Sequence, residues 1–406
     1  MNRREILRAA TTLLPLVVAG RAFAAPAASG TRLLVVFLRG AYDATNIIVP
    51  TSSDFYYASR KTIAISRPAA AFAPANPDAA IPLDSDWGLH PALRESIFPL
   101  WQKGQVAFVP FSGTDDMSRS HFETQDTIEL GQPVGGSRDY GSGFMARLAH
   151  AIGHDTPIAF TDQLPLCFRG GSTVPNIALN GVSKSVVDPR QAALIQAMYK
   201  DDHVGGGDLG ESVSEGFAVR DAVYKSIAVE MRSANRGAVS PRGFELSARR
   251  IGWLMRDQFN LAFVDVGGWD THVNQGGSQG YLAARIGELG RGLAGFAEDI
   301  GPDAWANTTV VVVSEFGRTF HENGNKGTDH GHGSIYWVLG GGVRGGRIVG
   351  PQVKLAVETL NDGRDLPVLT DYRSLVGGLV ARQFGLGADR LAQVFPSAKP
   401  TDLGLI

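Results

Sequence analysis

The feature that most constrains the fold is an uninterrupted apolar run near the N-terminus, Arg32-Leu33-Leu34-Val35-Val36-Phe37-Leu38. A strand that is apolar at every position must be covered on both faces, as in a parallel or mixed sheet with helices on either side. Similar short runs recur along the chain and are expected to be further strands of one sheet: residues 106–109, 261–266, 308–313 and 335–339.

Helical patterns lie between these strand patterns. The clearest has apolar residues at steps of three and four positions, which places them on one helix face: Leu282, Ile286, Leu289, Leu293, Phe296 and Ile300. This alternation predicts an α/β fold with a mixed, mostly parallel central sheet. Strand patterns near both ends favour a single domain over residues 25–406, with a helical insertion around residues 185–257.

The first residues are typical of a targeting signal rather than of part of the fold. Arg3 and Arg4 precede a short apolar stretch, and small residues at Ala22 and Ala24 fit a signal-peptidase site. We therefore predict a twin-arginine export signal over residues 1–24. The alternative, a membrane anchor, is disfavoured because spanning a bilayer takes about 20 apolar residues. The expected protein is periplasmic or secreted, meets the twin-arginine export machinery and has no stable membrane anchor.

The amino-acid composition limits the kinds of binding partner that are expected. The 38 Lys and Arg against 40 Asp and Glu give a formal charge of −2, so there is no basic field for a phosphate backbone and nucleic acid is not expected. Cys167 is the only cysteine, which excludes an intrachain disulfide even after export. Stability has to come from packing and from any bound metal.

Polar residues follow the predicted strands, where open α/β sheets place their ligands. Asp270 and His272 come after the strand at 261–266, and an extended backbone would point both to one side. One carboxylate with one imidazole suits a divalent metal. The alternative, hydrogen bonding to loop backbone, remains open for both residues, as a turn-forming role does for Asp43.

A second imidazole pair lies in the Gly-rich segment before the strand at 335–339. His330 and His332 are two residues apart there, and Asp329 precedes them. Three possible ligands within four residues, leading into a strand, favour metal binding, more for His330 than for His332.

The stretch Arg119-Ser120-His121 opens a predicted helix after the strand at 106–109. Either Ser118 or Ser120 caps that helix, with Glu123 completing a capping box with Ser120, or Ser120 acts as a nucleophile or anion contact beside His121. The local sequence favours the cap.

Taken together, the export signal and five motifs resemble one exported bacterial family, the domain-of-unknown-function 1501 family. The motifs are residues 38–43, 119–122, 268–272, 314–319 and 327–330. That family is itself similar to the alkaline phosphatase and sulfatase superfamily. The resemblance implies an alkaline phosphatase-like three-layer sandwich with helical insertions and a two-metal site for ester hydrolysis.

The same resemblance implies roles for individual residues. Ser120 stands at the position of the nucleophile, and Glu315-Phe316 replaces the usual Asp-His pair, so one imidazole is missing unless His332 or Asp329 replaces it. Arg119 and Arg318 are expected to bind non-bridging oxygens of a phosphate or sulfate ester. The remaining metal ligands implied are Asp43, Asp270, His272, Glu315 and His330.

Carboxylate and imidazole ligands together favour two divalent ions of zinc or manganese over calcium. Two function classes remain open at this point. One is an exported metal-dependent hydrolase of phosphate or sulfate esters, and the other is a catalytically degenerate metal-binding or accessory protein of the periplasm.

Overall fold

The structure is a computed structural model of the whole chain. It describes residues 30–69, 76–153, 155–171, 174–179, 189–199, 203–204, 207–208, 210, 213–214, 216–218, 236–240 and 242–406. The predicted export signal and much of the predicted insertion at 185–257 lie outside the described residues.

An eight-stranded mixed sheet forms the centre of the molecule. In spatial order its strands are β12 (Arg347–Ile348), β5 (Val106–Gly113), β11 (Ser334–Leu339), β10 (Thr308–Ser314), β1 (Arg32–Leu38), β9 (Leu261–Val266) and β6 (Pro157–Phe160), and β13 (Thr370–Asp371) pairs with β5. Only β11 runs antiparallel to its two neighbours, and all other pairings are parallel. The predicted α/β fold with a mixed, mostly parallel sheet is confirmed, as are its five predicted strands.

The all-apolar strand β1 divides its side chains between two cores. Leu34, Val36 and Leu38 belong to one buried cluster, whereas Leu33, Val35 and Phe37 belong to another on the opposite face. Successive side chains of a strand point to opposite faces, so only a sheet covered on both sides buries every position of β1.

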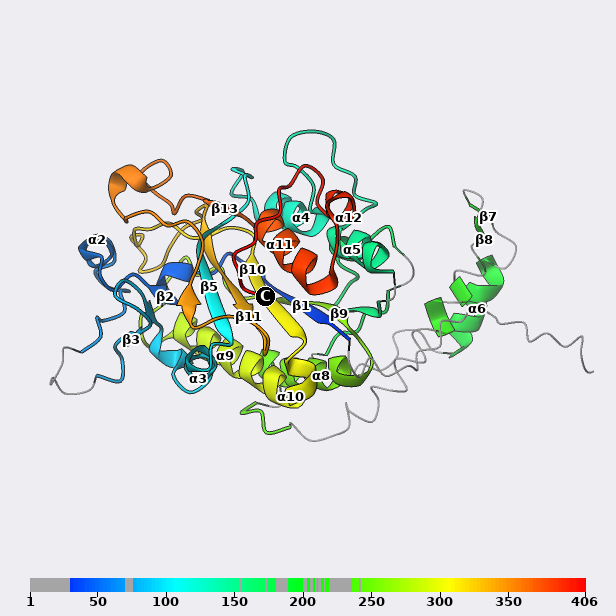
Figure 1. Ribbon diagram of the computed structural model, residues 1–406, viewed down its shortest axis with the longest axis horizontal. Coiled ribbons are helices and arrows are strands. Elements are labelled where there is room, and N and C mark those ends of the chain that lie inside the picture. Colours follow the sequence, from blue (N-terminus) through cyan, green and yellow to red (C-terminus); the bar gives the residue numbers. More distant parts are fainter. Residues whose placement is uncertain are drawn as a thin grey trace, which may run out of the picture.

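Helices cover both faces, which gives three layers (Figure 1). The first face carries α3 (Ile97–Gln102), α8 (Phe244–Asp257), α9 (Tyr281–Asp299) and α10 (Pro302–Trp305). The second face carries α4 (His121–Leu130), α5 (Phe144–Ile152), α11 (Tyr372–Phe384) and α12 (Ala388–Val394). The predicted apolar stripe of α9 is buried against the sheet from Leu282 to Phe296.

Smaller elements complete the described part of the chain. A small three-stranded sheet has the strand order β2 (Ile48–Val49), β4 (Gly88–Leu89) and β3 (Ile81–Pro82), and the helix α2 (Asp54–Ser59) follows β2 in sequence. The described residues also form four 3-10 helices: η1 (Ala44–Asn46), η2 (Pro91–Leu93), η3 (Leu166–Phe168) and η4 (Val357–Thr359). Within the range predicted as an insertion lie α6 (Pro189–Tyr199), the pair β7 (His203–Val204) and β8 (Gly207–Asp208), and α8, which packs against α9.

The strand directions bring distant loops to one edge of the sheet. Strands β1, β5, β9 and β10 point the same way, so their C-terminal ends share an edge, and the antiparallel β11 begins there. Loops that follow four strands and precede a fifth therefore meet, which is where ligands bind in open α/β sheets. Among the described residues, no helix combines the length and the apolar character needed to cross a membrane.

Candidate metal centre

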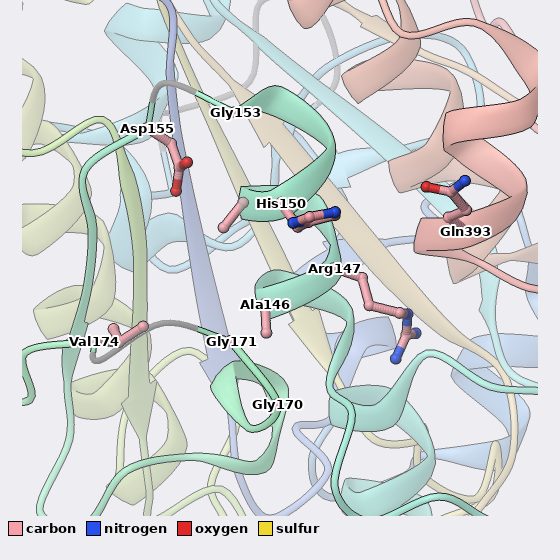
Figure 2. A pocket seen from close by; sticks show the side chains of 10 residues that line it. Ala146, Arg147, His150, Gly153, Asp155, Gly170, Gly171, Val174 and Gln393 are labelled. Carbon is pink, nitrogen blue, oxygen red and sulfur yellow. The ribbon is translucent and has the colours of Figure 1, made fainter. Parts of the chain in front are cut away.

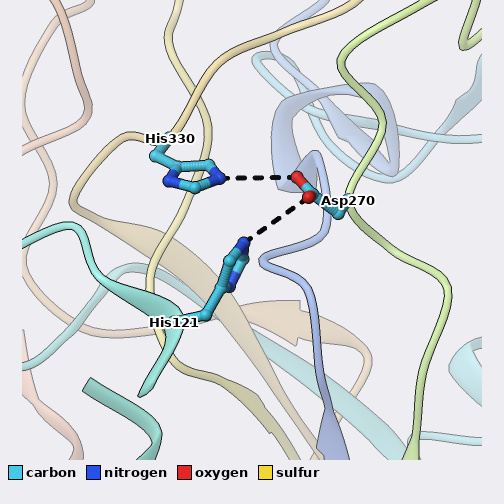
Figure 3. Close-up of side chains that lie close together, drawn as sticks. All are labelled: His121, Asp270 and His330. Atoms are coloured by element: carbon cyan, nitrogen blue, oxygen red, sulfur yellow. Dashed lines mark ion pairs between the residues drawn. The ribbon is translucent and has the colours of Figure 1, made fainter. Parts of the chain in front are cut away.

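Three side chains from three of these loops converge at the sheet edge (Figure 3). His121 begins α4, Asp270 follows β9 and His330 precedes β11. One ligand atom from each lies within 4.8 Å of the others. His272 joins them, because its Nε2 atom is 2.9 Å from Asp270 Oδ1. We call these four residues the histidine–aspartate cluster.

Each imidazole of the cluster is held at its Nδ1 atom by a group that can only accept a hydrogen bond. His121 Nδ1 lies 2.8 Å from Glu315 Oε1, and His272 Nδ1 lies 2.9 Å from Asp329 Oδ1. A carboxylate has no proton to give, so each Nδ1 carries a proton.

His330 follows the same rule with a backbone acceptor. Its Nδ1 atom donates to the carbonyl oxygen of Arg119 at 3.0 Å. All three imidazoles turn their Nε2 atoms toward Asp270. An acceptor that fixes the tautomer of a histidine from behind is the usual second shell of a metal ligand.

The Nε2 atoms crowd one another in a way that calls for a cation. Those of His272 and His330 are 3.1 Å apart, and the Nε2 atom of His121 is buried without a hydrogen-bond partner. A buried unpaired nitrogen costs about 1–3 kcal/mol. A divalent ion bound by the Nε2 atom of His121 would remove that cost.

The separations match the size of a zinc site. Asp270 Oδ1 is 3.5 Å from His330 Nε2, and Asp270 Oδ2 is 3.7 Å from His121 Nε2. Ligand atoms about 2.0–2.1 Å from a tetrahedral zinc ion lie about 3.3 Å from one another. His121, Asp270 and His330 therefore fit a single divalent ion bound by two imidazoles and one carboxylate, and His272 lies beside them.

The pKa shifts keep the ligands in their metal-binding forms. Burial raises the pKa of Asp270, but the hydrogen bond and charge of Arg318 outweigh it and hold that pKa below its usual value. Burial and the nearby His121 lower the pKa of His330. Both shifts leave an ionised carboxylate and a neutral imidazole at neutral pH.

Two glycines allow the loops to approach so closely. A Cβ atom on Gly40, whose φ is +113°, would lie 2.8 Å from the backbone nitrogen of Asp270, and one on Gly327 would lie 2.4 Å from the carbonyl oxygen of His272. The loop of Asp270 is anchored by the buried Trp269, whose ring meets Tyr42 edge to face at 6.0 Å.

Asp43 lies at the same edge but outside the cluster. Its fully buried carboxylate pairs with Arg60 at 2.5 Å and accepts a hydrogen bond from Gln275 at 2.7 Å. Thr45 donates to its other oxygen at 3.0 Å. These partners occupy the carboxylate that the family resemblance assigns to metal.

Glu315 lies behind His121 rather than beside Asp270. Burial raises its pKa, but hydrogen bonds from His121, Gln125 and the backbone of Gly40 outweigh this and hold the pKa below its usual value. His332 is buried, and its charged neighbours are Arg119 and acidic residues outside the cluster.

The two arginines expected to bind substrate oxygens contact the protein instead. The side chain of Arg318 is 0% exposed and donates to Asp270 and to backbone carbonyls. Arg119, whose φ is +52°, pairs with the buried Asp365 at 2.7 Å.

Ser120 occupies the N-cap position of α4, yet its side chain makes no capping hydrogen bond. The predicted capping box with Glu123 is therefore wrong at the level of the side chain. The half-buried hydroxyl precedes His121 directly and is not committed to the helix.

The sequence pointed to His121 as a catalytic residue beside Ser120, and it did not reveal His121 as a metal ligand. It stands alone in its segment, far from the Asp270 and His330 motifs, and α4 is amphipathic only weakly. Its one local signal is the position after a strand, at the start of a helix.

The cluster does not coincide with the pocket shown in Figure 2. That pocket, of about 590 Å³, is lined by residues that include Arg147, His150 and Gln393. Arg147 uses its guanidinium to bind the backbone carbonyls of Leu130 and Val394. The chemistry of the described part of the chain is thus concentrated at the sheet edge.

Comparison with known proteins shows which family the chain belongs to. The model of the family described as "Protein of unknown function (DUF1501)" matches residues 30–395. The chain belongs to this family. The DUF1501 match covers every member of the histidine–aspartate cluster, and no curated protein matches the chain.

Solved structures similar to this DUF1501 chain have low identity. Ps i-CgsB in complex with k-i-k-neocarrahexaose is 9% identical, with 92% of this chain and 75% of that chain covered and a TM-score of 0.37. The lipoteichoic acid synthase LtaP from Listeria monocytogenes is 10% identical, with 93% and 76% covered and a TM-score of 0.37. The alkaline phosphatase from the Antarctic bacterium TAB5 is 11% identical, with 79% and 94% covered and a TM-score of 0.31.

Proposed function

We propose that this protein is an exported, metal-dependent hydrolase of phosphate or sulfate esters. The observation that carries the proposal is the convergence of three imidazole Nε2 atoms on the carboxylate of Asp270, each imidazole held from behind at Nδ1. The donor set of imidazole nitrogens and a carboxylate oxygen favours zinc, with manganese as the second choice.

Access to the cluster supports a role in chemistry rather than in stability alone. The Asp270 side chain is 44% exposed, so its carboxylate is accessible from solvent. A divalent ion bound there supplies Lewis acidity, which polarises an ester oxygen and stabilises the negative charge that develops on it.

Ser120 is the proposed nucleophile. Its hydroxyl is free of the helix cap and lies next in sequence to His121, at the N-terminus of a ten-residue helix whose dipole favours anions. Attack by its oxygen forms a bond to phosphorus or sulfur while the alcohol leaves with a proton. Water then breaks the new ester bond and restores the hydroxyl.

The decisive experiment measures metal content and turnover together. Mature protein is stripped with chelator, reloaded with zinc or manganese, and assayed on aryl phosphate, phosphodiester and aryl sulfate. Turnover that needs the ion and disappears in both Ser120→Ala and His330→Ala supports the proposal. Turnover that survives Ser120→Ala would assign the attacking oxygen elsewhere.

The same experiment separates the second candidate, a metal-binding accessory protein. That candidate is favoured by Arg119 and Arg318, whose guanidinium groups are engaged by the protein rather than directed to a substrate. It requires a bound ion with no turnover on any ester class.

Export is part of the proposal and has its own test. Replacing both Arg3 and Arg4 by lysine is expected to retain the protein in the cytoplasm, because the twin-arginine pathway reads the arginine pair. Cell fractionation followed by immunoblotting measures the distribution, and unchanged export would rule out this pathway.

A further inference from the structure

The buried guanidinium of Arg318 sits in a cage of oxygens like the one that a bound cation would occupy. It donates to the carbonyl of Gly40 at 2.6 Å and to that of Thr328 at 3.1 Å, and also to Ala41 and to Asp270 Oδ1. Its Nη1 atom is 3.5 Å from His272 Nε2. A permanent positive charge therefore touches two members of the histidine–aspartate cluster.

Glu315, a carboxylate that could hold a second ion, has no free position. Glu315 Oε1 receives three hydrogen bonds, each of 2.8 Å, from Gly40, His121 and Gln125, and Oε2 receives one from Ser314, also at 2.8 Å. A carboxylate offers about four lone-pair sites, so Glu315 is saturated.

Asp43 is neutralised instead, by the guanidinium of Arg60. The side chains of Arg60 and Asp43 are 0% and 1% exposed, and Arg60 also donates to Asn46 at 2.9 Å. This pair balances its own charge. It leaves nothing for a metal ion next to the cluster.

The remaining charges match one divalent ion. Around the imidazoles stand the carboxylates of Asp270, Asp329 and Glu315 and the guanidinium of Arg318. Negative charge exceeds positive charge by two, the charge of a single divalent ion. A second such ion would be uncompensated and would lie close to a fixed cation, where repulsion is strong.

Building on the proposed function, we infer that the centre binds one divalent ion, and that Arg318 is its second, permanent cation. Arg318 donates a hydrogen bond to Asp270 Oδ1. This leaves Oδ2, the oxygen that faces His121, as the carboxylate ligand. Arg318 is thus a positioning residue and a source of charge, since its buried donors are directed to protein atoms.

The test is the metal stoichiometry, which needs no activity. Mature protein is stripped, saturated with zinc, freed of unbound ion and analysed by elemental mass spectrometry. His272→Ala, expected to bind none, measures the background. The expected wild-type result is one ion per chain, and Glu315→Gln is expected to keep that ion with about 10–100-fold weaker affinity.

The role of the Arg318 charge is tested with two substitutions, one that keeps the charge and one that removes it. Arg318→Lys keeps the positive charge and is expected to stay at one ion per chain, whereas Arg318→Gln removes it and is expected to bind more than one ion at saturation. Thermal unfolding checks that each variant folds. If Arg318→Gln does not fold, the wild type and Arg318→Lys still decide the stoichiometry.

Each outcome has a distinct meaning. Two ions in the wild type or in Arg318→Lys would overturn the inference and leave the proposed function standing. Loss of the ion in Glu315→Gln, or a folded Arg318→Gln that stays at one ion, would also overturn it. A wild type that binds no ion would remove the proposed function itself.

Discussion

Two groups of polar residues lie at the same edge of the sheet and differ in one respect, the saturation of their hydrogen bonds. The Asp43–Arg60 pair is fully buried and every oxygen of the carboxylate has a protein partner. In the histidine–aspartate cluster, Nε2 of His121 has none and two other Nε2 atoms face each other. Because burying an unpaired polar atom is costly, such an arrangement indicates a ligand, whereas a saturated one indicates structure.

The comparison predicts its largest effect at Arg60. Replacing Arg60 by methionine leaves the Asp43 carboxylate buried without its cation, which is expected to cost about 3–5 kcal/mol of unfolding free energy. Denaturant unfolding measures the loss. Arg67→Met is the control, because the Arg67–Asp54 pair is exposed and worth about 1 kcal/mol or less. Equal losses in the two variants would contradict the assignment of the Asp43–Arg60 pair to structure.

A saturated histidine sharpens the contrast with His121. Burial lowers the pKa of His90 from 6.5 to about 4, and its Nδ1 atom accepts a hydrogen bond from the backbone of Ala92 at 3.0 Å. As the pH falls below 6.5, the imidazole of His90 binds a proton in the unfolded chain but stays neutral in the folded chain. Stability is therefore complete above that pH and declines toward pH 4, by about 3 kcal/mol.

The measurement is urea unfolding of the wild type and of His90→Asn across this pH range. Asparagine keeps an acceptor at the helix cap but does not titrate there. We expect the stability difference between the two proteins to shrink as the pH falls. A difference that is independent of pH would mean that His90 does not stay neutral in the folded state.

An intermediate effect is expected where the two kinds of residue meet, at Asp329. Its Oδ1 atom accepts hydrogen bonds from His272 and Asn323, and it acts on the cluster by fixing a proton on Nδ1 of His272. Asp329→Ala should weaken zinc binding about 10–100-fold, with little change in the stability of the metal-free chain. Zinc titration against a competing chelator measures it. Asp362→Ala, which removes an exposed carboxylate near Arg119, should bind zinc normally.

The smallest effect is expected at Ser120, which is unsaturated like the cluster. An N-cap serine usually contributes about 1 kcal/mol, but the hydroxyl of Ser120 makes no capping bond. Ser120→Ala should therefore change the unfolding free energy by less than about 0.5 kcal/mol. Ser53→Ala is the matched control, because Ser53 caps α2 through Tyr56 at 3.2 Å and should cost about 1 kcal/mol. A larger loss of unfolding free energy in Ser120→Ala than in Ser53→Ala would mean that Ser120 has a structural role.

Much of the fold followed from local patterns. The run at β1 was recognisable because a strand covered on both faces is apolar at every position, and the stripe of α9 because burial of one helix face imposes a period of 3.6 residues. The short strand β6 was not predicted, since its four residues contain a proline and carry too little pattern. Asp270, His272 and His330 were recognisable as polar residues beside strands.

The sequence by itself determined which chemical groups stand at the strand ends and that the sheet would be covered on both sides. The tertiary structure alone decided which of them are free to bind. Asp43 is saturated by Arg60 and by Gln275, which is 232 residues away, and the Nδ1 atom of His121 is fixed by Glu315, 194 residues away. Hydrogen-bond saturation depends on partners brought together by chain folding, and no local pattern of residues encodes it.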